Sequence, residues 1–114
     1  PKPRPPFSLV RFQMAYNVLI YESKAFFWNA EANDTLKRER RVSLEAIVFH
    51  IERGDVLATV EYPNQDRTPG QNIFIININD YAYLVPFVEG SEEVFLKTII
   101  PNHKATNTYL RGRN

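Results

Sequence analysis

The fold follows from one stretch of the chain, Ile73-Phe-Ile-Ile-Asn-Ile-Asn-Asp-Tyr-Ala-Tyr-Leu-Val-Pro-Phe-Val88. Two mostly apolar runs flank Asn79-Asp80, and both of these residue types tolerate the positive φ angles of a tight turn. The second run places every other residue on one strand face: Tyr81, Tyr83, Val85 and Phe87. Pro86 has no amide hydrogen to donate, which indicates a bulge or a sheet edge there. The stretch therefore predicts two antiparallel strands joined by a short turn.

One more strand is predicted on each side of this pair. Val56-Leu-Ala-Thr-Val60 has the composition of a strand, and a long loop with two prolines and a glycine follows it at residues 62–71. After a glycine-serine turn, Val94–Ile100 is typical of a fourth strand. A short strand is also expected at Val18–Tyr21. Successive hairpin-like strands of this kind form an antiparallel meander.

Helical spacing dominates the segment before these strands. Ser43 is a suitable N-cap, and Gly54 can end the helix in a left-handed conformation. Between them apolar residues recur at i, i+3, i+4 and i+7, namely Leu44, Ile47, Val48 and Ile51. An earlier helix is expected after Asn29, with Leu36 on its apolar face, and a short helix is expected at Lys104–Leu110.

These elements predict an α+β fold in which two N-terminal helices pack on a four-stranded, mainly antiparallel sheet and a short C-terminal helix follows. A chain of 114 residues is large enough for one core. Four of the eight prolines fall in residues 1–13. We therefore predict a proline-rich N-terminal arm or extension at residues 1–25 and a single domain at residues 26–114.

Composition narrows the class of protein. No run of about 18 apolar residues is present, so no membrane-spanning helix is expected. The chain has no cysteine, which excludes disulfides and cysteine-type zinc sites, and no secretion signal is recognisable, so a cytoplasmic location is expected. Glycine-rich phosphate loops and the His-Glu-x-x-His and Gly-x-Ser-x-Gly motifs are absent. The sequence therefore predicts no metal and no organic cofactor.

Charge is distributed unevenly, although the formal net charge is +1. Four basic residues lie within five positions: Lys37, Arg38, Arg40 and Arg41. Residues 97–114 carry further basic side chains and no Asp or Glu. Such a distribution lets one face of a nearly neutral protein bind an anion, although most charge runs are solvated helix faces.

Metal-free RNA cleavage is compatible with this composition. RNA supplies its own nucleophile, the 2′-hydroxyl, so the protein has to position the substrate, neutralise the charge on the phosphorane and move protons. His103 is the predicted general acid or base, and the adjacent Lys104 is the predicted phosphate ligand. Lys97, expected to share a strand face with Phe95 and Ile99, can bring its ammonium group to the sheet edge. The alternative is a helix-terminal histidine bonded to the backbone and two solvated lysines.

Other residues are predicted to hold the RNA. Arg38, Arg40 and Arg41 are assigned to its backbone, and Tyr62, Tyr81 and Tyr83 to base stacking. Strand tyrosines more often pack against neighbouring side chains, which is the alternative for all three. His50 lies off the apolar helix stripe beside Glu52 and is interpreted as an ordinary surface or boundary histidine.

Five segments share their order and spacing with one known family. They are Trp28-Asn-Ala-Glu-Ala-Asn33, Leu36-Lys-Arg-Glu-Arg-Arg-Val-Ser-Leu-Glu45, Tyr62-Pro-Asn64, Ile73–Val88 and Ile99-Ile-Pro-Asn-His-Lys-Ala-Thr106. Together they cover roughly residues 26–110 and resemble the BrnT-like toxins of the RelE ribonuclease superfamily. In that family a Trp-centred turn opens a helix carrying Asn, and a basic helix end precedes a Ser-Phe-Glu type cap.

The resemblance implies a RelE-like fold, mRNA cleavage with relaxed sequence preference, and a cognate antitoxin that covers the basic surface and contacts DNA on behalf of the complex. The chain departs from the family pattern, which often has Gly where Arg41 stands, a basic residue where Ala32 stands and Arg where His103 stands. Arginine cannot be deprotonated at useful pH, so His103 changes the proton chemistry. The leading hypothesis is an endoribonuclease toxin of a type II toxin–antitoxin pair. The alternative is a catalytically inactive module that binds a DNA-binding partner.

Overall fold

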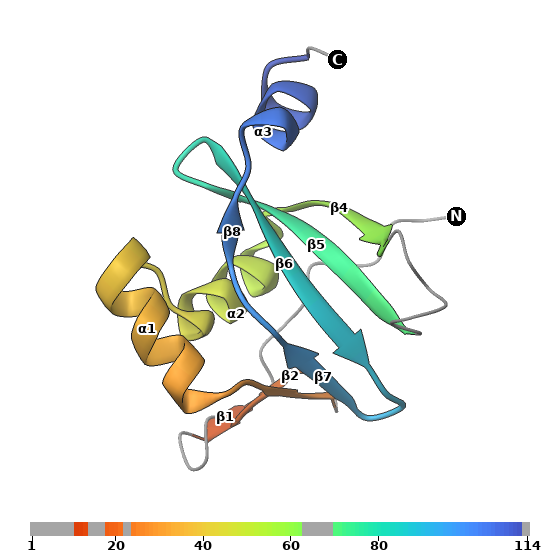
Figure 1. Ribbon diagram of the computed structural model, residues 1–114. Coiled ribbons are helices and arrows are strands. Elements are labelled where there is room, and N and C mark those ends of the chain that lie inside the picture. Colours follow the sequence, from red (N-terminus) through yellow and green to blue (C-terminus); the bar gives the residue numbers. More distant parts are fainter. Residues whose placement is uncertain (1–10, 14–17, 22–23, 63–69, 113–114) are drawn as a thin grey trace.

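The computed structural model describes residues 11–13, 18–21, 24–62 and 70–112. In this part of the chain eight strands form one mixed sheet, and three helices lie against it (Figure 1). The elements in chain order are β1 (Arg11–Gln13), β2 (Val18–Tyr21), β3 (Lys24–Phe27), α1 (Ala30–Arg40), α2 (Leu44–Arg53), β4 (Val56–Glu61), β5 (Gln71–Ile78), β6 (Tyr81–Glu89), β7 (Glu93–Leu96), β8 (Ile100–Pro101) and α3 (His103–Leu110). The predicted α+β class is confirmed.

The sheet differs from the predicted one in the number and direction of its strands. Its order is β1-β2-β3-β7-β6-β5-β4, and β8 pairs with β6. The pairs from β4 to β7 are antiparallel, as expected, but β3 runs parallel to β7, with Phe26 opposite Val94. The prediction of four strands was wrong because β1, β2 and β3 continue the sheet beyond β7. The first two helices therefore follow three strands instead of opening the domain.

Part of the segment predicted as an N-terminal arm belongs to this sheet. β1 pairs with β2, and β2 pairs with β3, in antiparallel register. The strand expected at Val18–Tyr21 is confirmed as β2. Residues 1–10, which hold the proline-rich part of the predicted arm, and residues 63–69 of the predicted long loop lie outside the described residues.

The β5–β6 hairpin forms as the sequence predicts. The two strands pair without interruption from Gln71 opposite Val88 to Ile78 opposite Tyr81. Asn79 and Asp80 adopt φ angles of 53° and 67°, so both turn residues are left-handed, as a tight hairpin turn requires. The Asp80 amide donates to Oδ1 of Asn77 at 2.9 Å, which fixes the turn further.

The predicted last strand, Val94–Ile100, is broken into β7 and β8. β7 pairs with β6 at Phe87–Glu89 and β8 pairs with it at Tyr83 and Leu84, so Pro86 lies in the gap between the two ladders. Proline has no amide hydrogen, and a continuous partner strand cannot use this position fully. The carbonyl of Pro86 still accepts from the amide of Lys97 at 2.9 Å.

Helices cover both faces of the sheet. On one face the four buried residues of the α2 stripe, Leu44, Ile47, Val48 and Ile51, pack with Trp28, Leu36 and the strand residues Phe74, Ile76, Val85 and Phe87. Each fully buried aliphatic side chain contributes roughly 1.5–3 kcal/mol. On the other face Ala105 of α3 packs with Ile75 and Ala82, near the β5–β6 turn. None of the helices in the described ranges is long and apolar enough to cross a membrane.

Buried Asn33 fixes the junction between α1 and α2. Its Oδ1 accepts from the Leu44 amide at 2.7 Å, and its Nδ2 donates to Oε1 of Glu45 at 2.8 Å. Burial by itself raises the pKa of Glu45, but the hydrogen bond from Asn33, a backbone hydrogen bond, the charge of Lys37 and Ser43 together hold that pKa below its ordinary value. One amide thus caps α2 and orients a carboxylate, which sets how the end of α1 meets α2.

Candidate functional site: a basic cleft between the helix junction and the β5–β6 hairpin

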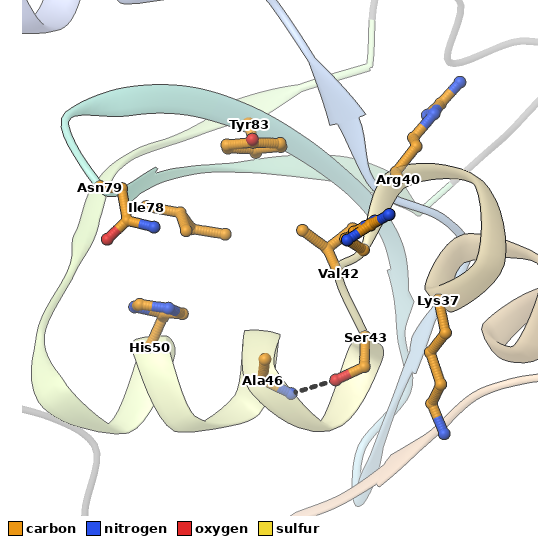
Figure 2. A pocket seen from close by; sticks show the side chains of 10 residues that line it. Lys37, Arg40, Val42, Ser43, Ala46, His50, Ile78, Asn79 and Tyr83 are labelled. Carbon is orange, nitrogen blue, oxygen red and sulfur yellow. Dashed lines mark hydrogen bonds between the residues drawn. The ribbon is translucent and has the colours of Figure 1, made fainter.

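A cleft of about 590 Å³ lies where the α1–α2 junction faces the β5–β6 hairpin (Figure 2). Its charged and polar lining consists of Lys37, Arg40, Arg41, Ser43, His50, Asn79 and Tyr83, and Val42, Ala46 and Ile78 complete the walls. The lining contains three permanent cations and no carboxylate. A cavity of this size accommodates a small organic ligand or part of a polymer, and this one favours an anion.

The cations of the cleft come from the C-terminal turn of α1. Lys37 and Arg40 belong to the helix, and Arg41 ends it at φ 59° and ψ 30°. A residue with a Cβ atom pays roughly 1–2 kcal/mol for this left-handed conformation. Backbone strain of this kind is concentrated at functional sites, and here it brings a guanidinium group to the cleft.

The basic side chains of this segment differ in the contacts that hold them. Nη1 of Arg40 donates to the Ile99 carbonyl at 2.5 Å, so this side chain joins α1 to the chain just before β8. Nζ of Lys37 lies 3.9 Å from Oε2 of Glu45, its side chain is 49% exposed, and Figure 2 shows it pointing past Ser43 and away from His50. Arg38 is exposed outside the cleft lining, and its Nη2 lies 3.4 Å from Oγ1 of Thr35.

His50 contributes a titratable imidazole to the cleft. Its Nδ1 lies 2.8 Å from Oδ2 of Asp55, and the two side chains are 17% and 23% exposed. The same carboxylate oxygen lies 3.3 Å from Nε of Arg53. Gly54 makes this contact possible, because its left-handed φ of 89° turns the chain back toward the end of α2. His50 is half-buried, as a boundary histidine is expected to be, but the sequence interpretation did not include its contact with Asp55, for which the signal is an acid placed directly after a helix-ending glycine.

The predicted RNA-binding residues are partly brought together. Arg40, Arg41 and Tyr83 line the cleft, and the ring of Tyr81 meets that of Tyr83 edge to face at 5.9 Å. Tyr83 is half-buried and also packs against the main core. Arg38 is not part of the lining. The arginine run therefore divides into residues that reach the cleft and one that does not.

The predicted cleavage residues lie elsewhere. His103 and Lys104 are exposed in the first turn of α3, on the face opposite α1 and α2, and Nε2 of His103 is 3.4 Å from Nδ2 of Asn107. Lys97 follows β7 and donates to Oε1 of Gln71 at 3.2 Å. Phe95 and Lys97 are both exposed whereas Ile99 is fully buried, so the prediction that Ile99 shares a face with these two residues was wrong. Residues 97–99 belong to neither β7 nor β8, so strict strand alternation does not extend to Ile99.

The residues that the structure describes include no candidate metal site. No three His, Asp or Glu side chains there gather closely enough to hold a metal ion.

Comparison of the chain with protein-family models, with curated proteins and with solved structures gives no match, so the resemblance to the BrnT-like toxins stays a prediction.

Proposed function

We propose that this protein is an endoribonuclease that acts as the toxin of a type II toxin–antitoxin pair and cleaves mRNA without a metal ion. The observation that carries the proposal is that Lys37, Arg40, Arg41, His50 and Tyr83 all belong to the lining of one cleft and that no carboxylate does. Cations neutralise phosphates, an imidazole exchanges a proton near neutral pH, and a tyrosine ring offers a surface on which a base can stack. RNA brings its own nucleophile, so a small domain can supply the remaining functions.

The proposed partner is a cognate antitoxin protein in the same cytoplasm. A basic cleft on a toxin is neutralised by a partner that inserts acidic side chains and excludes RNA. DNA would be contacted only through the DNA-binding part of that antitoxin.

The test compares two double variants that each remove two positive charges. Lys37→Gln/Arg41→Gln removes charges from the cleft, and Arg38→Gln/Lys104→Gln removes charges from outside it. Wild-type protein induced in a bacterial host is expected to arrest growth and deplete mRNA, and the purified protein is expected to cleave a single-stranded RNA. The cleft variant should lose more of both activities than its matched control, because it loses phosphate contacts.

Two results would contradict the proposal in different ways. Normal growth and intact RNA with folded wild-type protein would exclude the ribonuclease. A greater loss in Arg38→Gln/Lys104→Gln than in the cleft variant would keep the ribonuclease and move its site out of the cleft, toward residues that the sequence alone predicts.

The second candidate function is an inactive interaction module, and one observation favours it. Phe49 is 54% exposed on α2, with the guanidinium of Arg53 at 5.4 Å from its ring centroid. An exposed aromatic ring with an arginine over it is suited to a protein interface. Folded wild-type protein that binds a partner but cleaves no RNA would establish this alternative.

A further inference from the structure

We infer that His50, oriented by Asp55, is the catalytic base of the cleft and takes the proton from the RNA 2′-hydroxyl. This inference rests on the proposed ribonuclease function and names its reacting group. It assigns a role to the one histidine that the sequence interpretation left without a function.

The contact with Asp55 determines which nitrogen of His50 can act as a base. An ionised carboxylate only accepts hydrogen bonds, so Nδ1 of His50 carries the hydrogen and donates it across the 2.8 Å contact. The neutral ring then has its lone pair on Nε2. A histidine held in this tautomer by a carboxylate is the arrangement that general-base catalysis uses in unrelated enzymes.

The position of the ring connects this base to the cations. Figure 2 shows His50 rising from α2 toward Ile78 and Asn79 of the hairpin, with the Tyr83 ring beyond them and Arg40 on the α1 side. Arg41 lines the same cavity as the imidazole, so a phosphate that it neutralises there would lie beside the ring. The substrate, the cation and the base would therefore share one site. His103 lies on the opposite face of the sheet, outside this site.

The local structure does not need the side-chain pair to close the end of α2. The Asp55 amide already donates to the His50 carbonyl at 2.9 Å, and the Gly54 amide bonds to the Ile51 carbonyl at 3.1 Å. The helix end is thus satisfied by backbone hydrogen bonds. The additional contact between Nδ1 and the carboxylate fixes the orientation of the ring, and orientation is what a catalytic base requires.

The reaction balances with water as the other participant. Nε2 of His50 takes the 2′-hydroxyl proton while the 2′ oxygen attacks the adjacent phosphorus, and the bond between phosphorus and the 5′ oxygen breaks. The leaving 5′ oxygen takes a proton from water, and His50 later returns its proton to the hydroxide that remains. The products are a 2′,3′-cyclic phosphate and a 5′-hydroxyl end.

The experiment measures single-turnover cleavage of a short single-stranded RNA by the full chain and by His50→Ala, His50→Gln and His103→Ala. Binding of the same sequence as 2′-O-methyl RNA, which lacks the nucleophile, is measured in parallel with the thermal unfolding of each variant. His50→Ala is expected to lower the cleavage rate by about 10²- to 10⁴-fold, the usual contribution of a general base, while binding is retained. Added imidazole should restore part of the rate in His50→Ala, which a purely structural role would not allow.

The outcomes separate this inference from the function on which it rests. Wild-type protein that cleaves no RNA overturns both. If the wild-type protein cleaves RNA and both His50→Ala and His50→Gln cleave it equally fast, only the inference is overturned. A loss of activity in His103→Ala as large as that in His50→Ala would also overturn the inference alone. If His50→Ala does not fold, the folded His50→Gln variant decides: loss of cleavage with retained binding supports the role, and full cleavage overturns it.

Discussion

The two histidines of the chain lie on opposite faces of one sheet and differ in what surrounds them. His50 is 17% exposed, lies in a cleft with three cations and has a carboxylate 2.8 Å from its Nδ1. His103 is exposed in the first turn of α3 and lies 3.4 Å from an amide nitrogen of Asn107. In the sequence His103 differs from His50 by its basic neighbour Lys104, whereas only the folded chain gives a histidine an orienting carboxylate and a cavity.

The largest difference in cleavage rate is expected when the side chain that contacts each imidazole ring is replaced. Asp55→Asn is expected to slow RNA cleavage by roughly 10²- to 10⁴-fold, the upper figure being that of the same change in a serine-protease triad, with little change in affinity for 2′-O-methyl RNA. Asn107→Ala removes the neighbour of His103 and should leave the cleavage rate within experimental error. Single-turnover rates decide the comparison, and equal rates for Asp55→Asn and wild type would remove the orienting role of the carboxylate.

The free energy of unfolding should fall when a buried hydrogen bond is removed on either face of the sheet. Asn33→Ala removes the amide that braces α1 and α2 beside the cleft, and Thr106→Val removes the hydroxyl that accepts from the Ala82 amide at 2.8 Å beneath α3. Each change leaves a buried amide hydrogen without its partner, so each should lower the free energy of unfolding by about 1–3 kcal/mol. Urea unfolding measures both. Thr108→Ala, at an exposed position of α3, is the control and should lie close to wild type.

A smaller effect of opposite sign is expected at Arg41. Arg41→Gly relieves the left-handed backbone and should stabilise the protein by about 1 kcal/mol relative to Arg41→Gln, which loses the same charge but keeps a Cβ atom. Both variants should weaken RNA binding equally. Comparing the two variants therefore separates the charge of Arg41 from its backbone conformation. Equal stability of the two variants would mean that the backbone is not strained.

The salt dependence of RNA binding reports which cations contact phosphate. Each phosphate contact with single-stranded RNA contributes about 0.7 to the slope of log affinity against log salt concentration. Arg41→Gln should reduce this slope by about that amount, and Lys104→Gln should leave it unchanged if α3 lies outside the binding surface. A reduced slope for Lys104→Gln alone would transfer the binding site to the face of His103.

The smallest effect concerns the pH dependence of stability near the cleft. The folded state holds the pKa of Glu45 below its ordinary value of 4.5, so its ionised form stabilises the fold above that pH. This contribution is lost as the pH falls below about 4.5. Glu45→Gln should therefore flatten the decline of unfolding free energy between neutral pH and this acidic range. An unchanged decline in the variant would show that other carboxylates govern it.

Local patterns in the sequence were sufficient for the elements that local rules govern. The N-caps Asn29 and Ser43 accept from the amides of Ala32 and Ala46, as their positions predict. Gly54 ends α2 in the left-handed conformation, and the Asn79-Asp80 turn closes the hairpin. These features depend on hydrogen bonds and side-chain spacing within a few residues, so they can be recognised before the chain is folded.

The site was predictable in part. Arg40, Arg41 and Tyr83 were predicted to bind RNA and do line the cleft, because basic and aromatic residues suited to phosphates and bases can be recognised by type. The place of His50 in the cleft was not predicted, because it depends on the contact with Asp55 and on a hairpin that begins some twenty residues later. Residue type indicates what a side chain can do, and the packing of distant elements determines where it does it.

The sequence by itself determined the helices, the hairpin, the α+β class and the basic run at the end of α1. Only the tertiary structure decided that β3 joins the sheet beside β7 and that the predicted last strand is interrupted near its pairing with Pro86 of β6. It also decided that His50 shares a cleft with Arg40 and Arg41. The physical reason is distance along the chain. Ala25 pairs with Glu93 and Arg40 bonds to Ile99, and such contacts follow from the burial of a common core, which no local pattern encodes.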